Sequence, residues 1–359
     1  MPRTDLFQEG ERILRICNSC RYCEGYCAVF PAIERRQTFP EGDLNYLANL
    51  CHNCSECYYA CQYAPPHEFA VNVPKLLAEI RAESYQQYAW PRVFAKGPVV
   101  WLIIAVCLIL SILFAKGTTP QPGGDFYRIV PHRVMVMAFG GVSIFVLLAF
   151  AVGFARCWRD SGERFLQFLN PGTLAKALRD VLTLHYLDGG GGGCAYPGAH
   201  QSQSRRWFHH FTFYGFALCF ASTVTAAFYH YAFGWRAPYG YLSIPVVLGT
   251  SGGIAMVIGT LGLLWLKRTS NPETQAQGQS GMDLTFLALL FLASASGLAL
   301  LAFRQTAAMG VLLIVHLGII LALFLTLPYG KFVHAIYRSA ALVKYSLERS
   351  RIKAGWTEP

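Results

Sequence analysis

The sequence predicts an all-α membrane protein, in which a polar N-terminal helical domain precedes a bundle of six transmembrane helices. Of its 359 residues, 54% are hydrophobic, but the apolar residues are unevenly distributed. The segment 1–96 is polar and holds eight of the twelve cysteines, whereas long uncharged runs follow from residue 97 onward. A run of about 20 apolar residues can cross the ~30 Å hydrocarbon core of a bilayer. We place six such runs at 98–115, 134–154, 209–232, 243–266, 284–303 and 308–328.

The distribution of basic residues predicts the orientation of these spans. If the runs alternate and the N-terminus is inside, the inner segments carry 25 of the 30 Lys and Arg, and the outer segments carry five. Cytoplasmic loops carry such an excess, so both termini are expected in the cytoplasm. The charged opening MPRTDLFQEGERILRI, which has no apolar signal region, agrees. The net charge of +10 is thus assigned to membrane topology and not to nucleic-acid binding.

These patterns divide the chain into three regions. We expect a multi-pass protein of the bacterial cytoplasmic (inner) membrane, surrounded by membrane lipid, with its cysteine-rich domain in the cytoplasm. The regions are a cysteine domain at 1–96, a transmembrane domain at 97–334 with a cytoplasmic loop at 155–207, and a basic cytoplasmic tail at 335–359.

Two cysteine runs, ICNSCRYCEGYC and CHNCSECYYAC, share the spacing C-x2-C-x2-C-x3-C. In bacterial ferredoxins this spacing places three thiolates on one 4Fe–4S cluster and the fourth on another cluster. Disulfides are disfavoured in a reducing cytoplasm. Zinc is the stronger alternative, but zinc knuckles supply two ligands each. The spacing predicts two clusters, one held by Cys17, Cys20, Cys23 and Cys61 and the other by Cys51, Cys54, Cys57 and Cys27.

The segments around these runs, such as EGDLNYLANL, have helical periodicity and not the alternation of strands. An α-helical ferredoxin domain is therefore expected, in place of a short β-rich one.

Histidines at the ends of the apolar runs are the second candidate site. Ionisable side chains in a membrane are costly and mark functional positions. His316 and His334 lie 18 residues apart, which is five helical turns, although Pro328 and Gly330 can kink the helix between them. The third and sixth spans run in opposite directions, so the start of one lies at the same depth in the membrane as the end of the other. Histidines at the same depth can therefore face each other. The predicted inner set is His209, His210 and His334, and the predicted outer set is His316, His230 and His132.

Imidazoles from facing helices are the usual axial ligands of a b-type haem. We therefore predict one or two b haems, which are not covalently attached because the chain lacks a C-x-x-C-H motif.

The inner loop contains a run of five glycines, in LDGGGGGCAYPGAH. Its simplest interpretation is a flexible hinge. The alternative is a docking or cofactor-contacting loop that uses His185, Cys194 and His200. The run does not fit the G-x-G-x-x-G pattern, and no Walker loop is present elsewhere. The chain is thus expected to carry electrons without a substrate-oxidising site of its own.

Several motifs together resemble the family of tricarballylate utilization protein B, also called citrate/tricarballylate utilization protein. They are the two cysteine runs, the six spans, and the segments LDGGGGGCAYP, RRWFHHFTFYGF and LPYGKFVH. The resemblance implies a subunit that reoxidises a soluble FAD-dependent tricarballylate dehydrogenase, whose product is cis-aconitate. Electrons would pass through the clusters and haem b to the quinone pool.

The segment LPYGKFVH, with a histidine 18 residues before its own, is also similar to the haem-bearing helix of nitrate reductase gamma subunits. This second resemblance implies that His316 and His334 are haem ligands. Two other hypotheses remain open from the residues alone. One is a membrane redox sensor or assembly factor that uses the same clusters, and the other is a zinc-binding membrane adaptor.

Overall fold

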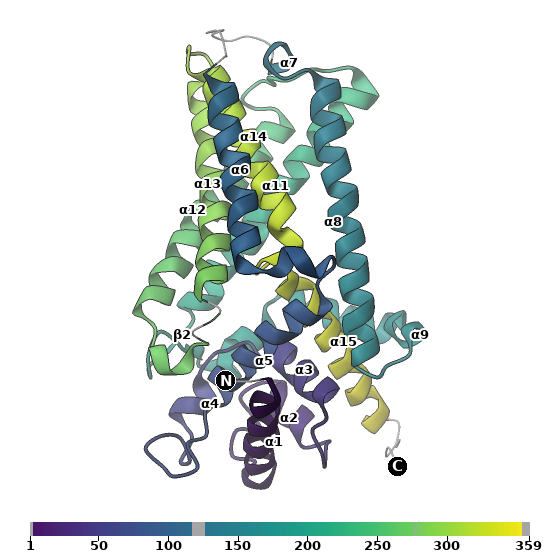
Figure 1. Ribbon diagram of the computed structural model, residues 1–359, viewed down its shortest axis with the longest axis vertical. Helices are drawn as coiled ribbons and strands as arrows, with labels where there is room; N and C mark the ends of the chain where they lie inside the picture. Colours follow the sequence, from purple (N-terminus) through teal and green to yellow (C-terminus); the bar gives the residue numbers. More distant parts are fainter. Residues whose placement is uncertain (1–2, 117–125, 277, 279, 354–359) are drawn as a thin grey trace.

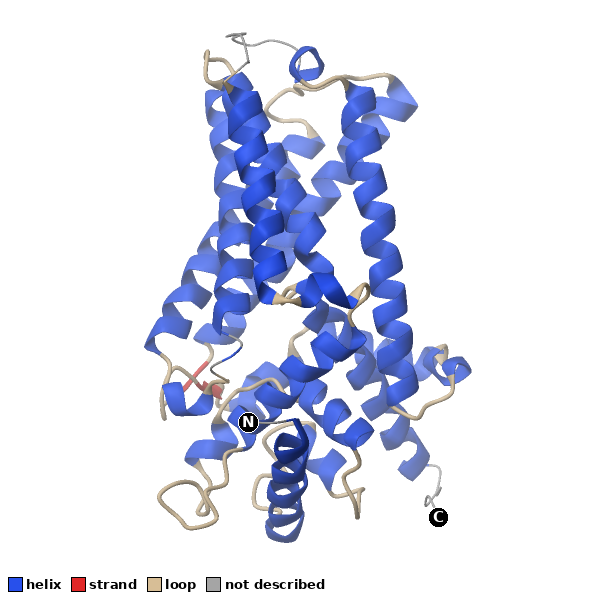
Figure 2. Cartoon of the chain, in the orientation of Figure 1, coloured by secondary structure: helices blue, strands red, loops and turns tan. Residues whose placement is uncertain are grey.

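The computed structural model describes residues 3–116, 126–276, 278 and 280–353, and it is built almost entirely of helices (Figure 1). The long helices form one end of the molecule, and a domain of shorter helices forms the other end, which also contains the first and the last described helices, near residues 3 and 353. Within the described residues, strands are confined to one short antiparallel pair, β1 (Cys194–Ala195) and β2 (Gln201–Ser202), seen in Figure 2. The predicted all-α architecture is confirmed at this level.

The N-terminal domain is a cluster of helices with its own apolar core. A typical member is α5, which begins after Asn72, because the Asn72 side chain accepts a hydrogen bond from the Lys75 backbone N–H. Its Leu77 and Ile80 side chains are fully buried. The elements are α1 (Arg3–Cys20), α2 (Val29–Ile33), α3 (Glu41–Leu50), α4 (Glu56–Tyr59), α5 (Val73–Tyr88) and the 3-10 turn η1 (Arg92–Ala95).

Six helices of the described chain are long and apolar enough to cross a membrane, as predicted. Neighbouring pairs include α11 with α12, α6 with α14, and α13 with both α12 and α14. The six helices are α6 (Gly97–Ala115), α8 (His132–Asp160), α11 (Ser204–Phe233), α12 (Ile244–Thr269), α13 (Ser280–Phe303) and α14 (Met309–Thr326). The segments between them contain α7 (Phe126–Ile129), α9 (Phe165–Phe168), α10 (Pro171–Leu182), η2 (His185–Gly191) and η3 (Pro272–Thr274).

The sixth span does not continue as one regular helix to His334. It ends at Thr326, passes through the 3-10 turn η5 (Leu327–Tyr329), and resumes as α15 (Val333–Lys353). Pro328 lies at the start of η5 and Gly330 follows it in an extended conformation. The five-turn register expected between His316 and His334 is therefore broken.

The segment predicted as a basic tail begins within α15, which packs into the N-terminal domain. Leu342, Val343 and Leu347 of α15 are buried in the same apolar core as α1, α3 and α5. Cys157 and Trp158 from the end of α8 join this core. The N-terminal domain, the end of α8 and α15 therefore lie at the same end of the molecule. Whether that end faces the cytoplasm stays a prediction.

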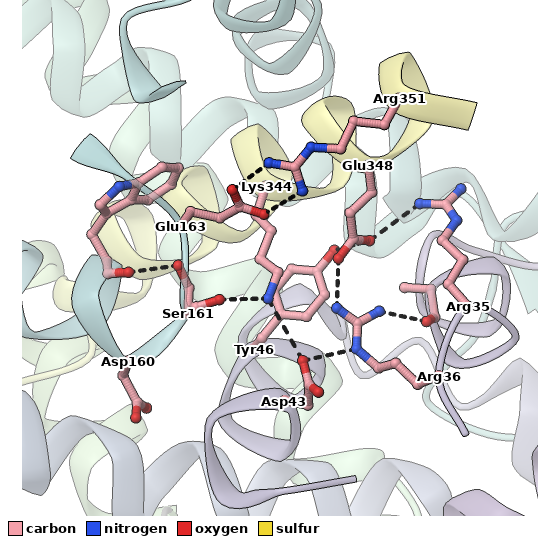
Figure 3. A network of polar contacts seen from close by, with 12 residues as sticks. Arg35, Arg36, Asp43, Tyr46, Asp160, Ser161, Glu163, Lys344, Glu348 and Arg351 are labelled. Carbon is pink, nitrogen blue, oxygen red and sulfur yellow. Dashed lines mark hydrogen bonds and ion pairs between the residues drawn. The ribbon is translucent and has the colours of Figure 1, made fainter. Parts of the chain in front are cut away.

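A polar network fastens α15 to the N-terminal domain (Figure 3). Glu348 of α15 accepts hydrogen bonds from Arg36 at 2.5 Å and from Arg35 at 3.2 Å, and its other neighbour, Tyr46, donates at 3.2 Å. Arg36 also donates to Asp43 at 2.8 Å. The side chains of Arg36 and Glu348 are each only about 10% exposed, so solvent screens this ion pair weakly.

Replacing Glu348 with alanine is expected to lower the free energy of unfolding by about 3 kcal/mol, because the buried Arg36 would lose its main counter-charge. The measurement is denaturant unfolding of the detergent-solubilised protein. Glu11→Ala is the matched control, since its pair with Arg15 is exposed and should be worth less than about 0.5 kcal/mol. Equal effects of the two substitutions would show that the network does not hold α15 in place.

Candidate functional site

The first predicted cysteine set lines one cavity of about 250 Å³ in the N-terminal domain. Cys17 and Cys20 lie in the last turn of α1, and the chain then reverses at Arg21, which adopts a left-handed conformation with φ of 56°. Cys61 follows α4 and reaches the cavity from the other side. The predicted members on its wall are Cys17, Cys20, Cys23 and Cys61, with Cys57 of the other set beside them.

The second predicted set lines an adjoining cavity of only about 10 Å³, so a cluster there requires the thiols to move apart. Asn53 and Ser55 both have positive φ and bend the loop that carries this set back on itself. The backbone N–H of Asn53 points at the Cys51 sulfur at 3.3 Å, an interaction that stabilises a thiolate. The predicted members on this wall are Cys27, Cys51, Cys54 and Cys57.

The arrangement of the first thiol set, around its cavity of about 250 Å³, fits a group larger than a single ion. In the described part of the chain, no three His, Cys, Asp or Glu side chains converge closely enough to hold one metal ion. Zinc would require its sulfur ligands about 2.3 Å from a common point. A cube of four irons instead takes one thiolate at each corner, which suits four cysteines around a shared cavity.

Burial and crowding make these thiols hard to ionise without a cation. Burial, with the neighbouring thiols, raises the pKa of Cys17 and of Cys23 to about 12. The pKa of Cys27 is also raised, again mainly by burial. A bound metal stabilises thiolates, so binding of a metal at these cysteines would release protons.

The glycine run packs tightly against both cysteine runs. Gly190 lies against Gly25, between Cys23 and Cys27, so closely that a Cβ at Gly190 would come within 3.1 Å of the Gly25 carbonyl oxygen. A Cβ on the adjacent Gly189 would lie 3.5 Å from the Glu56 side chain, in the second run. Four of these glycines have positive φ, which other residues adopt only with strain. In this structure the run is a packed contact with the cysteine loops, whereas a flexible hinge was expected.

Cys194 is the one member of the predicted loop trio that the structure places beside a cysteine of the two runs, Cys54. It is fully buried in one apolar cluster with Cys54, Leu187 and Tyr196. Its thiol lies 3.4 Å from the Leu187 carbonyl oxygen and donates to it. His185 stacks edge-on against Tyr186, and His200 is exposed.

Replacing Gly190 with alanine is expected to destabilise the protein by about 1–2 kcal/mol, because the residue must keep a φ of +73° and avoid the Gly25 backbone. Thermal unfolding of the purified protein measures this loss. Gly198→Ala, in the same loop, has no atom within 4 Å of its new Cβ and no positive φ, so it should be nearly neutral. A neutral Gly190→Ala would contradict the packed conformation.

His209 and His334 face each other across a cavity at the junction of the two domains. Their ring centroids are 6.0 Å apart, with the ring planes at 66°. Metal–imidazole bonds are about 2 Å long, so this gap can hold one metal atom between the rings. His334 donates its Nδ1 proton to the Lys331 carbonyl at 2.5 Å, which leaves Nε2 free as a ligand.

The cavity around this pair has a volume of about 470 Å³. Its apolar wall is rich in aromatic rings, as expected for a slot that holds a flat, apolar macrocycle. The rings on this wall belong to Phe213, Phe216, Phe220, Phe286 and Phe332.

His210, the alternative inner ligand, points elsewhere. Its ring stacks on Tyr214 at 5.7 Å and lies near Trp207 on the same helix. Of the two adjacent histidines, His209 is therefore the one that the structure pairs with His334.

The outer histidines are not arranged around a common slot. His132 and His230 stack directly on each other, with centroids 3.9 Å apart, which leaves no space for a haem between them. His316 instead lies between α13 and α14, with its Nδ1 atom 2.9 Å from the Ser296 hydroxyl. The residues at the outer level, as they lie, do not fit a second haem.

The two cysteine cavities and the histidine cavity adjoin one another, because neighbouring cavities share lining residues. Cys57 lines both cysteine cavities. His52 and Asn53 line both the second cysteine cavity and the cavity of His209 and His334. The two cysteine sets and the histidine pair therefore form one continuous series.

Sequence reasoning missed two arginines that join this series. Arg205 lies four residues before His209 and donates to the Asn53 carbonyl at 2.6 Å. Arg338 lies four residues after His334 and donates to the Cys51 carbonyl at 2.8 Å. Residues four apart share a helix face, so the spacings R-x3-H and H-x3-R were a readable signal.

The fold and the site define a class of protein, one in which a helical, cysteine-rich domain of the ferredoxin type is joined to six apolar helices. Residues 10–89 match the family model described as the Citrate utilization protein B Fer4-like domain, and residues 93–355 match that of Citrate utilization protein B. The chain belongs to the Citrate utilization protein B family.

A relative supports the assignment over nearly the full length. Citrate utilization protein B of Escherichia coli is 49% identical over 359 residues, covering 96% of this chain and 93% of that protein. No solved structure matches the chain. The family expected from the sequence motifs is thus confirmed at the level of citrate utilization protein B.

Proposed function

We propose that the chain is the membrane electron-transfer subunit of an organic-acid oxidising system. It takes electrons from a soluble FAD-dependent tricarballylate dehydrogenase and delivers them to the quinone pool. The cysteine sets 17, 20, 23, 61 and 51, 54, 57, 27 hold two 4Fe–4S clusters, and His209 and His334 hold one haem b. These groups supply one-electron redox chemistry, which lets a two-electron flavin donor be oxidised in single steps.

The series of adjoining cavities is the observation that carries this proposal. Electron transfer weakens steeply with distance, so a carrier must place its redox groups next to one another. Here Cys57 connects the first pair of cavities, and His52 with Asn53 connects the second pair.

The exposure of the cavities supports a direction of electron transfer, from the first cysteine set toward the histidine pair. The first cysteine cavity opens beside exposed residues, among them Tyr22, which is 69% exposed. In the second set, Cys51 and Cys54 are each only 7% exposed. A soluble donor can therefore approach the first set, and the second set lies between it and the histidine pair.

The identity of the organic acid is the most specific part of the proposal. The relative's name concerns citrate, while the sequence motifs resemble a family that also acts with tricarballylate. Both acids are tricarboxylates, and the chain itself shows no flavin or dinucleotide fingerprint. Oxidation of the acid is therefore assigned to the flavoprotein partner.

The decisive experiment is anaerobic purification followed by metal, sulfide and haem analysis. We expect about eight irons in clusters, with equal acid-labile sulfide, and one b-type haem per chain. Dithionite-reduced haem should then be reoxidised by added quinone. Zinc without iron would remove the redox proposal, and reduced haem that quinone cannot reoxidise would favour a sensor.

A further inference from the structure

We propose that the polar wall of the histidine cavity is a carboxylate-binding site. The lining of the cavity is largely apolar, but it also includes five basic side chains and one acidic one, which together are called its polar wall. These are Arg81, Arg205, Lys267, Lys331, Arg338 and Asp283. None of these six residues is exposed, and their imbalance of charge points to an anionic ligand.

The two lysines share a single counter-charge. Lys267 of α12 lies 2.7 Å from one Asp283 oxygen, and Lys331 lies 2.9 Å from the other. All three side chains are less than a quarter exposed. One carboxylate between two ammonium groups leaves one positive charge unneutralised.

The three arginines are held by neutral acceptors. Arg81 donates to the Cys51 carbonyl at 2.5 Å, and Arg205 and Arg338 donate to carbonyls of the same loop. Peptide carbonyls satisfy N–H groups but do not cancel their charge. The Cys51 thiolate of the proposed cluster offsets only part of the charge of Arg81 and Arg338. The Nε atom of Arg81, a residue only 3% exposed, has no hydrogen-bond partner among the residues that the structure describes.

Carboxylate is the chemistry that this wall would recognise. Arginine binds carboxylates through paired N–H groups, and lysine adds a point charge. Two sources can supply it. One is the propionate side chains of a haem held by His209 and His334, in which case the inference rests on the proposed function. The other is a free tricarboxylate of the citrate type.

Haem and its dimethyl ester separate these sources, because the ester has the same macrocycle without carboxylates. We expect the haem-depleted protein, purified in detergent, to bind haem about tenfold more tightly than the ester. Lys267→Gln and Lys331→Gln should bring this ratio toward one. Lys176→Gln, on the exposed face of α10, should leave it unchanged. Retained cluster iron confirms that each variant is folded.

Citrate is the probe for the second source. If haem and its ester bind equally, citrate should raise the melting temperature of the haem-depleted protein more than sulfate at equal ionic strength, and Lys267→Gln should abolish the effect. Equal binding of haem and ester together with no effect of citrate would overturn the inference. Failure of both haem compounds to give a bis-imidazole spectrum would instead remove haem from the proposed function, while the citrate result still decides the carboxylate site.

Discussion

Replacing Cys54 with alanine is expected to remove the second iron–sulfur cluster, and with it about half of the acid-labile sulfide. Quinone reduction driven by the flavoprotein should be lost, because the second cysteine cavity connects the first to the histidine pair. Haem content should remain near the wild-type value, since Cys54 does not line the histidine cavity. Sulfide analysis, reduced-haem spectra and quinone turnover measure the three outcomes.

Two variants make this test specific. Cys219→Ala changes a half-buried thiol between α11 and α12, and it should leave sulfide content unchanged. Cys54→Ala combined with Cys194→Ala tests whether the buried neighbour Cys194 substitutes as a ligand. Full sulfide content in that double variant would show that Cys54 holds no cluster. If Cys54→Ala lost haem as well as sulfide, the cluster site and the haem site would not be independent of each other.

The spans could be predicted because hydropathy averages over about 20 residues and is insensitive to any single one. The residues at which these helices end, beyond their apolar runs, could not be predicted in the same way. Helix α8 continues to Asp160, past the predicted end at residue 154, because Trp158 is buried against the N-terminal domain. A helix that leaves the membrane but enters another core carries no local signal of where it stops.

The packing of the region after residue 334 could not be predicted from its local sequence either. Its basic residues are typical of a cytoplasmic tail, yet Lys344 is only 6% exposed and donates to the Ser161 carbonyl. The partners that bury it lie about 180 and 300 residues earlier in the chain. Composition alone cannot reveal pairings over such separations.

Glycine composition was equally ambiguous. A run of glycines predicts flexibility when nothing contacts it and tight packing when another backbone lies close by. Gly190 belongs to the second case, because it lies against Gly25. The cysteine spacing was more informative, since its predicted sets line the two cavities, although cluster binding itself stays a prediction.

Replacing His209 or His334 with alanine is expected to abolish haem binding, whereas His210→Ala should retain it. Adjacent residues on a helix point roughly 100° apart, so only one of the two neighbours can face the cavity. His209 faces His334 at 6.0 Å, while His210 stacks on Tyr214. Because a bis-imidazole haem needs both axial nitrogens, losing either should remove the low-spin spectrum.

The pyridine haemochrome assay gives haem content, and reduced spectra report the ligand state. His316→Ala is the companion variant, since His316 contacts Ser296 and does not line the cavity. It should leave the haem content unchanged if His209 and His334 form the only haem site of the chain. Loss of haem in His316→Ala, with His209→Ala retaining it, would transfer the site to the outer level. In every variant, unchanged sulfide content would show that the cysteine domain remains folded, so that haem loss reports the missing ligand and not a collapsed protein.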